Sequence, residues 1–295
     1  MVVVVGGPSS EKLGSAIAKI LNISYINLES KVFPDDESYI KFPDEFDADN
    51  LIVIQSCFPK QDKRFLELLF ILDTAKEFGV KNLNVVIPYL PYARQDKRFR
   101  KGEVVSNKSI GNILHIVGTD FLLTIDAHQE ESLKQFKMKS VSISAMPLLA
   151  EYLKKMDLSD PCIIAPDIGA INQAEIVSTI LKTNYTFFEK KRDRITGKVE
   201  TAKKDLTFHG KDVVIVDDMI STGGTISNVS KIAKDSGAEK IVATCTHALL
   251  VGDAEEKMRN SGITDIVTTD TVPNPFSNIS VAPIIADTLR KFIEF

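Results

Sequence analysis

The chain has 295 residues, of which 44% are hydrophobic and 26% charged, with a formal net charge of -4 at pH 7. This length exceeds the ~100–200 residues of one domain and predicts two, while the slight acidity argues against broad nucleic-acid binding. No apolar run approaches the ~18 residues of a membrane span, and the start of the chain has no basic export signal. Cys57, Cys162 and Cys245 lack disulfide or metal-ligand spacing, which favours a reducing compartment. We therefore expect a cytoplasmic protein with no membrane or nucleic-acid partner.

Short runs rich in β-branched residues alternate with amphipathic stretches along the chain. Apolar strands separated by helices indicate mainly parallel sheets flanked by helices, which is an α/β fold. We predict strands at 1–5, 50–55, 82–90, 120–126, 161–167, 212–218 and 240–250, and helices at 63–79 and 225–238.

One part of this layout occurs twice. The stretch from 50 to 90 and the stretch from 212 to 250 each run strand, helix, strand, which predicts two related α/β domains. After its first strand, the first copy has QSCFPKQ and the second has DDMISTGG. The two domains are therefore expected to differ in function.

Two loops of the first half carry groups suited to a nucleotide, although each alone is typical of an ordinary loop. FPDDE, residues 33–37, places an aromatic ring beside acids, and RQDKR, residues 94–98, offers a guanidinium, an amide and a carboxylate after a strand. An aromatic ring can stack on a base, and a carboxylate can accept a hydrogen bond from its amine.

Two strand ends carry candidate metal ligands. Asp126 and His128 are two residues apart, so they face the same way if the strand geometry persists. Alone, His128 is more typical of a hydrogen-bonded histidine than of a ligand to Mg²⁺, which prefers oxygen. Asp167 ends another strand, and the following turn, DIGA, offers backbone amides for a pyrophosphate.

The segment 188–205, FEKKRDRITGKVETAKKD, is too charged to bury. It is predicted to be a mobile lid, and a solvated surface loop is the alternative. In an extended chain Lys190 and Arg192 point to one side and Lys191 to the other.

The segment 213–228, VVIVDDMISTGGTISN, combines carboxylates, hydroxyls and glycines at the junction of a strand and a helix. A helix start presents unpaired N–H groups and partial positive charge, so a phosphate can bind there without a basic residue. The carboxylates can accept hydrogen bonds from the vicinal hydroxyls of a sugar. This pattern indicates a sugar-phosphate site; a capped helix after an acidic strand end is the alternative.

These motifs together resemble one enzyme family. VVIVDDMISTGGT is similar to the phosphoribosyl-diphosphate signature of the type I phosphoribosyltransferase fold. PYARQDKRFRKGEVVSNK, TIDAHQEESLKQF, IIAPDIGA, FEKKRDR and SVAPIIADTL resemble, in the same order, segments of the ribose-phosphate pyrophosphokinases. Ser221 stands where many members have an acidic residue, and the chain is shorter than many bacterial members, which leaves regulation by a second nucleotide site in doubt.

The resemblance implies two phosphoribosyltransferase-type domains, at 1–142 and 143–282, with 283–295 completing the first. It implies Mg²⁺ as cofactor. It implies catalytic roles for Lys190 and Arg192, ATP contacts by Phe33, Asp35, Glu37, Arg94, Gln95 and Asp96, metal ligation by His128 and Asp167, and ribose 5-phosphate contacts by Arg192, Asp217, Asp218, Ser221, Thr222, Gly223, Gly224 and Thr225.

The implied reaction converts ribose 5-phosphate and ATP to 5-phosphoribosyl 1-diphosphate and AMP. The resemblance further implies a homo-oligomer, at least a dimer, in which residues 33–37 complete the ATP site of a neighbouring subunit. A nucleobase phosphoribosyltransferase and a non-catalytic regulator that binds phosphoribosyl diphosphate are the alternatives. Neither a P-loop sequence nor a dinucleotide fingerprint is present.

Overall fold

A computed structural model describes residues 1–188, 190–192, 199–201 and 207–294. The chain divides into two units, which we describe separately. Unit 1 comprises residues 1–143 and 280–295, and unit 2 comprises residues 144–279. Within the described residues, no helix has both the length and the apolar character needed to cross a membrane.

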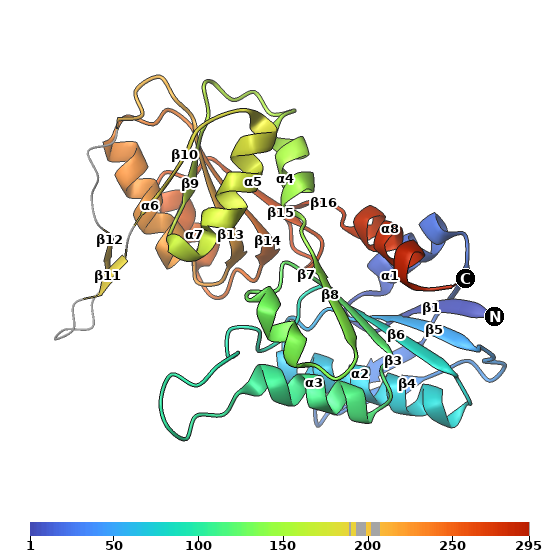
Figure 1. The fold of residues 1–295 in the computed structure, drawn as a ribbon. Coiled ribbons are helices and arrows are strands. Elements are labelled where there is room, and N and C mark those ends of the chain that lie inside the picture. The colour runs from blue at the N-terminus through green and yellow to red at the C-terminus, as the bar shows by residue number, and fades with distance from the viewer. Residues whose placement is uncertain (189, 193–198, 202–206, 295) are drawn as a thin grey trace. The chain divides into compact units, whose positions relative to one another are not determined.

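Unit 1 is built on a parallel sheet with the strand order β2-β1-β5-β6-β7-β8 (Figure 1). Its strands are β1 (Val2–Gly6), β2 (Ser24–Ile26), β5 (Asn50–Ile54), β6 (Asn82–Ile87), β7 (Phe121–Ile125) and β8 (Lys139–Ile143). The four central strands are almost wholly buried, because helices cover both faces. Strand β6 ends before Pro88, which has no N–H group for the ladder, so it is shorter than predicted.

Helices pack on both faces of this sheet, with α2 and α3 on one side and α1 and α8 on the other (Figure 1). They are α1 (Glu11–Leu21), α2 (Gln61–Glu77), α3 (Ser106–Ile116) and α8 (Ala282–Phe292), with a 3₁₀ helix η1 at Glu130–Gln135. The core under α2 includes Leu68 and Ile71, which contact the buried valines of β1 and β5. An antiparallel hairpin, β3 (Glu29–Val32) and β4 (Ser38–Lys41), lies outside the main sheet.

Unit 2 has a second parallel sheet, in the order β10-β9-β13-β14-β15-β16. Its strands are β9 (Cys162–Ala165), β10 (Tyr185–Phe187), β13 (Val213–Ile220), β14 (Ile241–Ala248), β15 (Asp265–Thr269) and β16 (Ser277–Ile279). One core packs the sheet against α6 (Gly224–Asp235) and α7 (Ala254–Asn260). Another packs it against α4 (Met146–Leu153) and α5 (Ile171–Leu181), and η2 (Ile168–Ala170) precedes α5.

The two units share one topology. In each, the strand that starts the α/β motif lies second in the sheet, the next strand forms the edge, and an antiparallel hairpin follows. The hairpin of unit 2 pairs β11 (Lys190–Arg192) with β12 (Val199–Thr201). Both sheets are parallel and flanked by helices, which confirms the predicted fold class of two related α/β domains. The residue limits 1–142, 143–282 and 283–295 stay a prediction for the phosphoribosyltransferase-type domains.

Candidate active site

Asp217 and Asp218 lie inside β13, not at its end as the sequence predicted. The strand continues through Met219 and Ile220, which are buried and pair with His247 and Ala248 of β14. Met219 and Ile220 are apolar, which favours the longer strand. In the sequence, the acidic pair before them indicated that the strand had already ended. The carboxylates still lie in the carboxyl-terminal half of the strand, where parallel α/β sheets bind ligands.

Asp167 follows β9, the strand that pairs with β13. In the parallel register, Ile164 lies beside Ile215, so Asp167 lies near Asp217 and Asp218. Burial and then the negative charges of Asp218 and Asp167 raise the pKa of Asp217 well above its ordinary value. The carboxylate of Asp167 accepts a hydrogen bond from the backbone N–H of Gly169 at 2.9 Å. Asp167, Asp217 and Asp218, all predicted site residues, therefore lie close together toward the carboxyl ends of β9 and β13.

The predicted phosphate loop connects this edge to α6. Ser221, Thr222 and Gly223 form the turn, and the helix begins at Gly224 with no side chain capping it. Thr225 lies in the first helical turn. Because the first N–H groups of a helix have no partners within the helix, this start suits a phosphate.

Gly223 is required by its conformation and by α7. Its φ of 69° is in the left-handed region, and a Cβ there would lie 3.0 Å from Cγ of Met258 and 3.1 Å from the carbonyl oxygen of Ala254. Only glycine combines this dihedral with this close approach at low cost. The turn is therefore shaped partly by a helix that follows it by 30 residues in sequence, beyond the reach of the local motif.

Lys257 of α7 is a basic neighbour of the loop that the sequence reasoning missed. Its Nζ donates to the carbonyl oxygen of Thr222 at 3.3 Å and to the carboxylate of Asp253 at 3.1 Å. The i,i+4 spacing of Asp253 and Lys257 in sequence predicts their ion pair, but gives no indication of the contact with the loop.

In unit 1, the candidate nucleotide segment 33–37 forms the turn of the β3–β4 hairpin. The backbone N–H of Phe33 donates to the carbonyl of Glu37 at 2.8 Å, and the N–H of Glu37 donates to the Asp35 carboxylate at 3.2 Å. Phe33 is 41% exposed, and its ring meets Tyr39 edge-on at 5.9 Å. Lys31 Nζ lies over the same ring, 5.5 Å from its centroid, so the turn carries a partly exposed aromatic ring with a cation on it.

The segment with Arg94, Gln95 and Asp96 lies in the loop between β6 and α3, and Gln95 contacts the start of α3. The side-chain carbonyl of Gln95 accepts a hydrogen bond from Ser106 Oγ at 2.6 Å, and its backbone carbonyl accepts from the N–H of Asn107 at 3.2 Å. The side chain of Arg94 is exposed. Gln95 therefore has a clear structural role at the start of α3 besides its predicted ATP contact.

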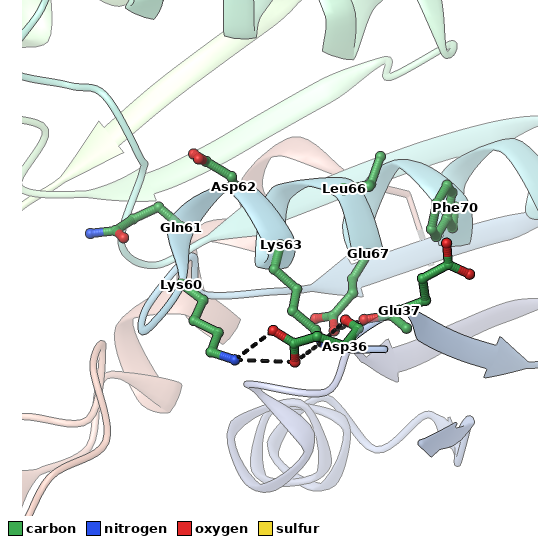
Figure 2. A pocket seen from close by; sticks show the side chains of 10 residues that line it. Asp36, Glu37, Lys60, Gln61, Asp62, Lys63, Leu66, Glu67 and Phe70 are labelled. Carbon is green, nitrogen blue, oxygen red and sulfur yellow. Dashed lines mark hydrogen bonds and ion pairs between the residues drawn. The ribbon is translucent and has the colours of Figure 1, made fainter. Parts of the chain in front are cut away.

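Contacts through the start of α2 connect the two candidate nucleotide segments. Lys60 and Lys63 reach Asp36 in the hairpin turn (Figure 2), at 3.1 and 3.2 Å. Asp62 accepts a hydrogen bond from the hydroxyl of Tyr92. The backbone carbonyl of Tyr92 in turn accepts from the N–H of Gln95 at 3.0 Å. The hairpin turn 33–37 and the segment 94–96, which are far apart in sequence, are thus both connected to residues at the start of α2.

The geometry assumed for Asp126 and His128 is wrong. Strand β7 ends at Ile125, and Asp126 has a φ of 38°, so the alternation of a strand does not apply. The N–H of Asp126 donates to the carbonyl of Ile143 at 2.9 Å, which is the last hydrogen bond of the ladder between β7 and β8. His128 is exposed in unit 1, whereas Asp167 is in unit 2. Their joint role as metal ligands stays a prediction.

The predicted lid, 188–205, lies mostly outside the described residues. The described part consists of the buried Phe188 and the backbone of β11 and β12, where Lys190 is opposite Thr201 and Arg192 is opposite Val199. The predicted mobility and the predicted roles of the two cations thus stay predictions.

The carboxylates of unit 2 fit a hard cation in chemistry. Among the described residues, no group of three or more His, Cys, Asp or Glu side chains is arranged to hold a metal ion. However, Asp167, Asp217 and Asp218 supply the oxygen ligands that Mg²⁺ prefers. Burial is the main cause of the raised pKa of Asp217, and the charges of Asp218 and Asp167 add to it; a bound cation would offset both effects.

Two parallel α/β units, one of which carries carboxylates and an uncapped helix start at the carboxyl ends of its strands, place the chain in the α/β class, whose members bind ligands at this end of the sheet. Residues 2–118 match the family model described as the N-terminal domain of ribose phosphate pyrophosphokinase. Residues 198–292 match the model of the phosphoribosyl synthetase-associated domain.

Whole-chain relatives define the family further. The chain is 39% identical over 290 residues to the ribose-phosphate pyrophosphokinase of Sulfurisphaera tokodaii, covering 98% of this chain and 99% of that one. It is 39% identical over 288 residues to the protein of the same name from Methanothermobacter thermautotrophicus, covering 97% and 99%. The phosphoribosylpyrophosphate synthetase structure from Mycobacterium smegmatis has a TM-score of 0.86 at 25% identity, covering 98% of this chain and 97% of that one.

The chain belongs to the ribose-phosphate pyrophosphokinase family. These matches confirm the family, the fold class and the enzyme class predicted from the sequence. The family is a kinase-type family that uses nucleotide substrates.

Proposed function

We propose that the chain transfers the pyrophosphoryl group of MgATP to ribose 5-phosphate at the edge of the unit 2 sheet. The observation that carries this assignment is the uncapped start of α6, which a short turn connects to the strand that carries Asp217 and Asp218. One end of this arrangement suits a phosphate and the other suits vicinal hydroxyls, so together they fit a sugar phosphate. The whole-chain relatives favour this reaction over that of a nucleobase phosphoribosyltransferase.

The ribose 5-phosphate would be held by its two ends. The 5-phosphate would accept hydrogen bonds from backbone N–H groups and hydroxyls of residues 221–225. The carboxylates of Asp217 and Asp218 would accept hydrogen bonds from the ribose hydroxyls. Fixing both ends orients the anomeric hydroxyl and removes much of the entropic cost of the transfer.

The anomeric oxygen would attack the β-phosphorus of ATP. A new bond forms between this oxygen and the β-phosphorus, the bond from the β-phosphorus to the α,β-bridging oxygen breaks, and AMP leaves as the hydroxyl loses its proton. Lys190 and Arg192 would offset the charge that develops on the transferring group. Arg192 would also contact ribose 5-phosphate.

The ATP would be recognised by unit 1 residues. Phe33 would stack on adenine, and Asp35 or Glu37 would accept a hydrogen bond from its amine. Arg94, Gln95 and Asp96 would contact the remainder of the nucleotide. We propose that the chain is at least a dimer in which the 33–37 turn serves the neighbouring subunit, and that the enzyme is cytoplasmic.

We propose Mg²⁺ as the cofactor, held by Asp167 and His128, with Asp217 and Asp218 close to the first of these. When bound, Mg²⁺ would neutralise charge between the phosphate groups. The residues of the chain would bind and orient the two substrates and exclude water from them.

Phosphorus NMR of the purified protein with ribose 5-phosphate, ATP and Mg²⁺ tests the reaction. We expect AMP and a sugar-linked diphosphate to appear in equal amounts. Ribose lacking the 5-phosphate is the matched control and should give little product. Formation of ADP would show a simple kinase and would overturn the proposal, as would the absence of any product.

A further inference from the structure

Glu67 of α2 is a buried carboxylate that joins three parts of unit 1. Its side chain is 2% exposed. It accepts hydrogen bonds from Ser38 Oγ at 2.6 Å, from Arg64 Nη1 at 2.8 Å and from Gln55 Nε2 at 3.3 Å. Buried charges in proteins are stable only when they are paired in this way. Ser38 is the first residue of β4, so the network holds the hairpin where the turn ends.

Asp36 anchors the same turn at its centre. Lys60 Nζ lies 3.1 Å from its carboxylate, and Lys63 Nζ donates to its backbone carbonyl at 2.6 Å and to its carboxylate at 3.2 Å. The two lysines hold the pKa of Asp36 below its ordinary value, mainly through these hydrogen bonds. The φ of Asp36 is 72°, which is the conformation that lets the turn close.

Asp36 and Ser38 contact the region of α2 through polar groups, whereas Ile40, further along β4, packs against the apolar core of unit 1. A pocket of about 580 Å³ separates the turn from the apolar side of α2, with Leu66 and Phe70 on the wall (Figure 2). These two side chains are 48% and 44% exposed, so they do not form a core with the turn. Within residues 33–38, the contacts of Asp36 and Ser38 therefore connect the turn to α2, while Ile40 fixes the base of the hairpin on the core.

The side chains with predicted nucleotide contacts belong to the same turn as these two anchors. Asp35 and Glu37 flank Asp36, and Phe33 starts the turn with its ring against Tyr39. A binding segment that is already ordered does not lose further conformational freedom when its ligand binds. Anchoring the turn thus favours affinity for the nucleotide without contact between the anchors and the ligand.

We propose that contacts with α2 hold the hairpin turn in the position in which residues 33–37 recognise the adenine nucleotide. Asp36, Ser38 and Glu67 are then positioning residues for this recognition. The inference rests on the proposed function, because it takes the turn as part of an ATP site. It holds whether the turn serves its own subunit or a neighbouring one. In both cases the anchors act within the chain that carries the turn.

Steady-state kinetics of Ser38→Ala and Asp36→Asn test this inference in the full-length enzyme. Ser38→Ala should raise KM for ATP about 3–10-fold, and Asp36→Asn about 2–5-fold because its carboxylate is 66% exposed, while kcat and KM for ribose 5-phosphate change by less than about twofold. Ser38→Thr keeps the hydroxyl donor and should restore most of the affinity. Ser30→Ala, at an exposed serine of the same hairpin, is the matched control and should resemble the wild type.

The outcomes separate this inference from the proposed function. If the wild type makes the diphosphate product but both variants keep a normal KM for ATP, the inference is overturned and the proposed function stands. Equal changes in KM for both substrates, or a large drop in Tm, would show a general structural role and would also overturn the inference. If the wild type makes no product, the proposed function itself fails.

Discussion

The two units use one strand order but differ in what their sheets present at the same position. In unit 1 Val53 lies beside Val5, and in unit 2 Ile215 lies beside Ile164. Two residues further on, Gln55 and Asp217 therefore occupy equivalent places. The same backbone position carries a neutral amide in one unit and a carboxylate in the other.

The surroundings of these two residues differ as much as their chemistry. Gln55 is fully buried; its oxygen accepts hydrogen bonds from the N–H and Oγ of Ser9, at 3.2 and 2.8 Å, and its nitrogen donates to Arg64 and Glu67. Asp217 instead lies among other carboxylates. In unit 1 the polar side chain at this position makes all its hydrogen bonds within the protein. In unit 2 the carboxylates at this position are grouped together and remain suited to a ligand. Function here follows from side chains placed on a shared fold.

The hairpins differ in the same sense. Hairpin β3–β4 of unit 1 carries an aromatic ring and acids, whereas strand β11 in the equivalent hairpin of unit 2 carries Lys190 and Arg192. We therefore expect the unit 1 hairpin to act in nucleotide recognition and the unit 2 hairpin to act in the transfer step.

Removing the cation of the unit 2 hairpin should have the largest effect. Lys190→Ala should lower kcat about 10²–10³-fold, because a charge that stabilises the transferring group is lost. Affinity for ribose 5-phosphate should change by less than about threefold. Turnover assays and calorimetric titration measure the two quantities, and Lys191→Ala is the matched control. Equal losses in turnover and affinity would contradict a transition-state role.

Changing the equivalent edge residues should separate the two units. Asp217→Asn should lower kcat/KM for ribose 5-phosphate about 10–100-fold through loss of a charged acceptor. It should also raise the Tm of the ligand-free protein at pH 7 by about 2–8 °C. A raised folded-state pKa means that stability is lost as pH rises above the unfolded pKa of ~3.9, so the gain should vanish near that pH.

Gln55→Ala should show the opposite behaviour. It leaves buried partners such as Glu67 without one hydrogen bond, so the free energy of unfolding should fall by about 1–3 kcal/mol. KM for ribose 5-phosphate should be unchanged. Thermal unfolding and kinetics of both variants test the comparison directly. A change of ribose 5-phosphate affinity in the unit 1 variant would contradict the division of roles.

Sequence patterns predicted β1, β5, β6, β7, β9, β13 and β14, which are rich in apolar and β-branched residues, but they did not predict the buried strand β15 (Asp265–Thr269). The short strands β2 and β16 were missed, since runs such as Ser24–Ile26 carry too few apolar residues to show a period. The positive φ of Asp126, which ends the alternation of β7, was also missed, because the apolar run 120–126 reads as one continuous strand. Tertiary contacts decide such elements.

The site was predictable where its chemistry is local. The carboxylates, glycines and hydroxyls of residues 217–225 are consecutive, so their pattern alone indicated a sugar-phosphate loop. Glu67 was not predictable, because an acidic residue on an amphipathic helix is normally a solvated one. Its importance depends on Ser38 and Gln55, which lie 29 and 12 residues away in sequence.

Lys257 offers the smallest and most specific test of the unit 2 site. In a trans peptide the C=O and N–H groups point in opposite directions, so holding the carbonyl of Thr222 toward α7 aims the N–H of Gly223 away from α7. Lys257→Met should therefore raise KM for ribose 5-phosphate about 2–5-fold, a modest effect because the side chain is 40% exposed. The kcat should stay nearly constant. Asp253→Asn removes the ion pair but keeps the lysine, so it should leave KM close to the wild-type value. If Asp253→Asn weakened binding as much as Lys257→Met, the ion pair within α7, and not the contact with the loop, would be the cause.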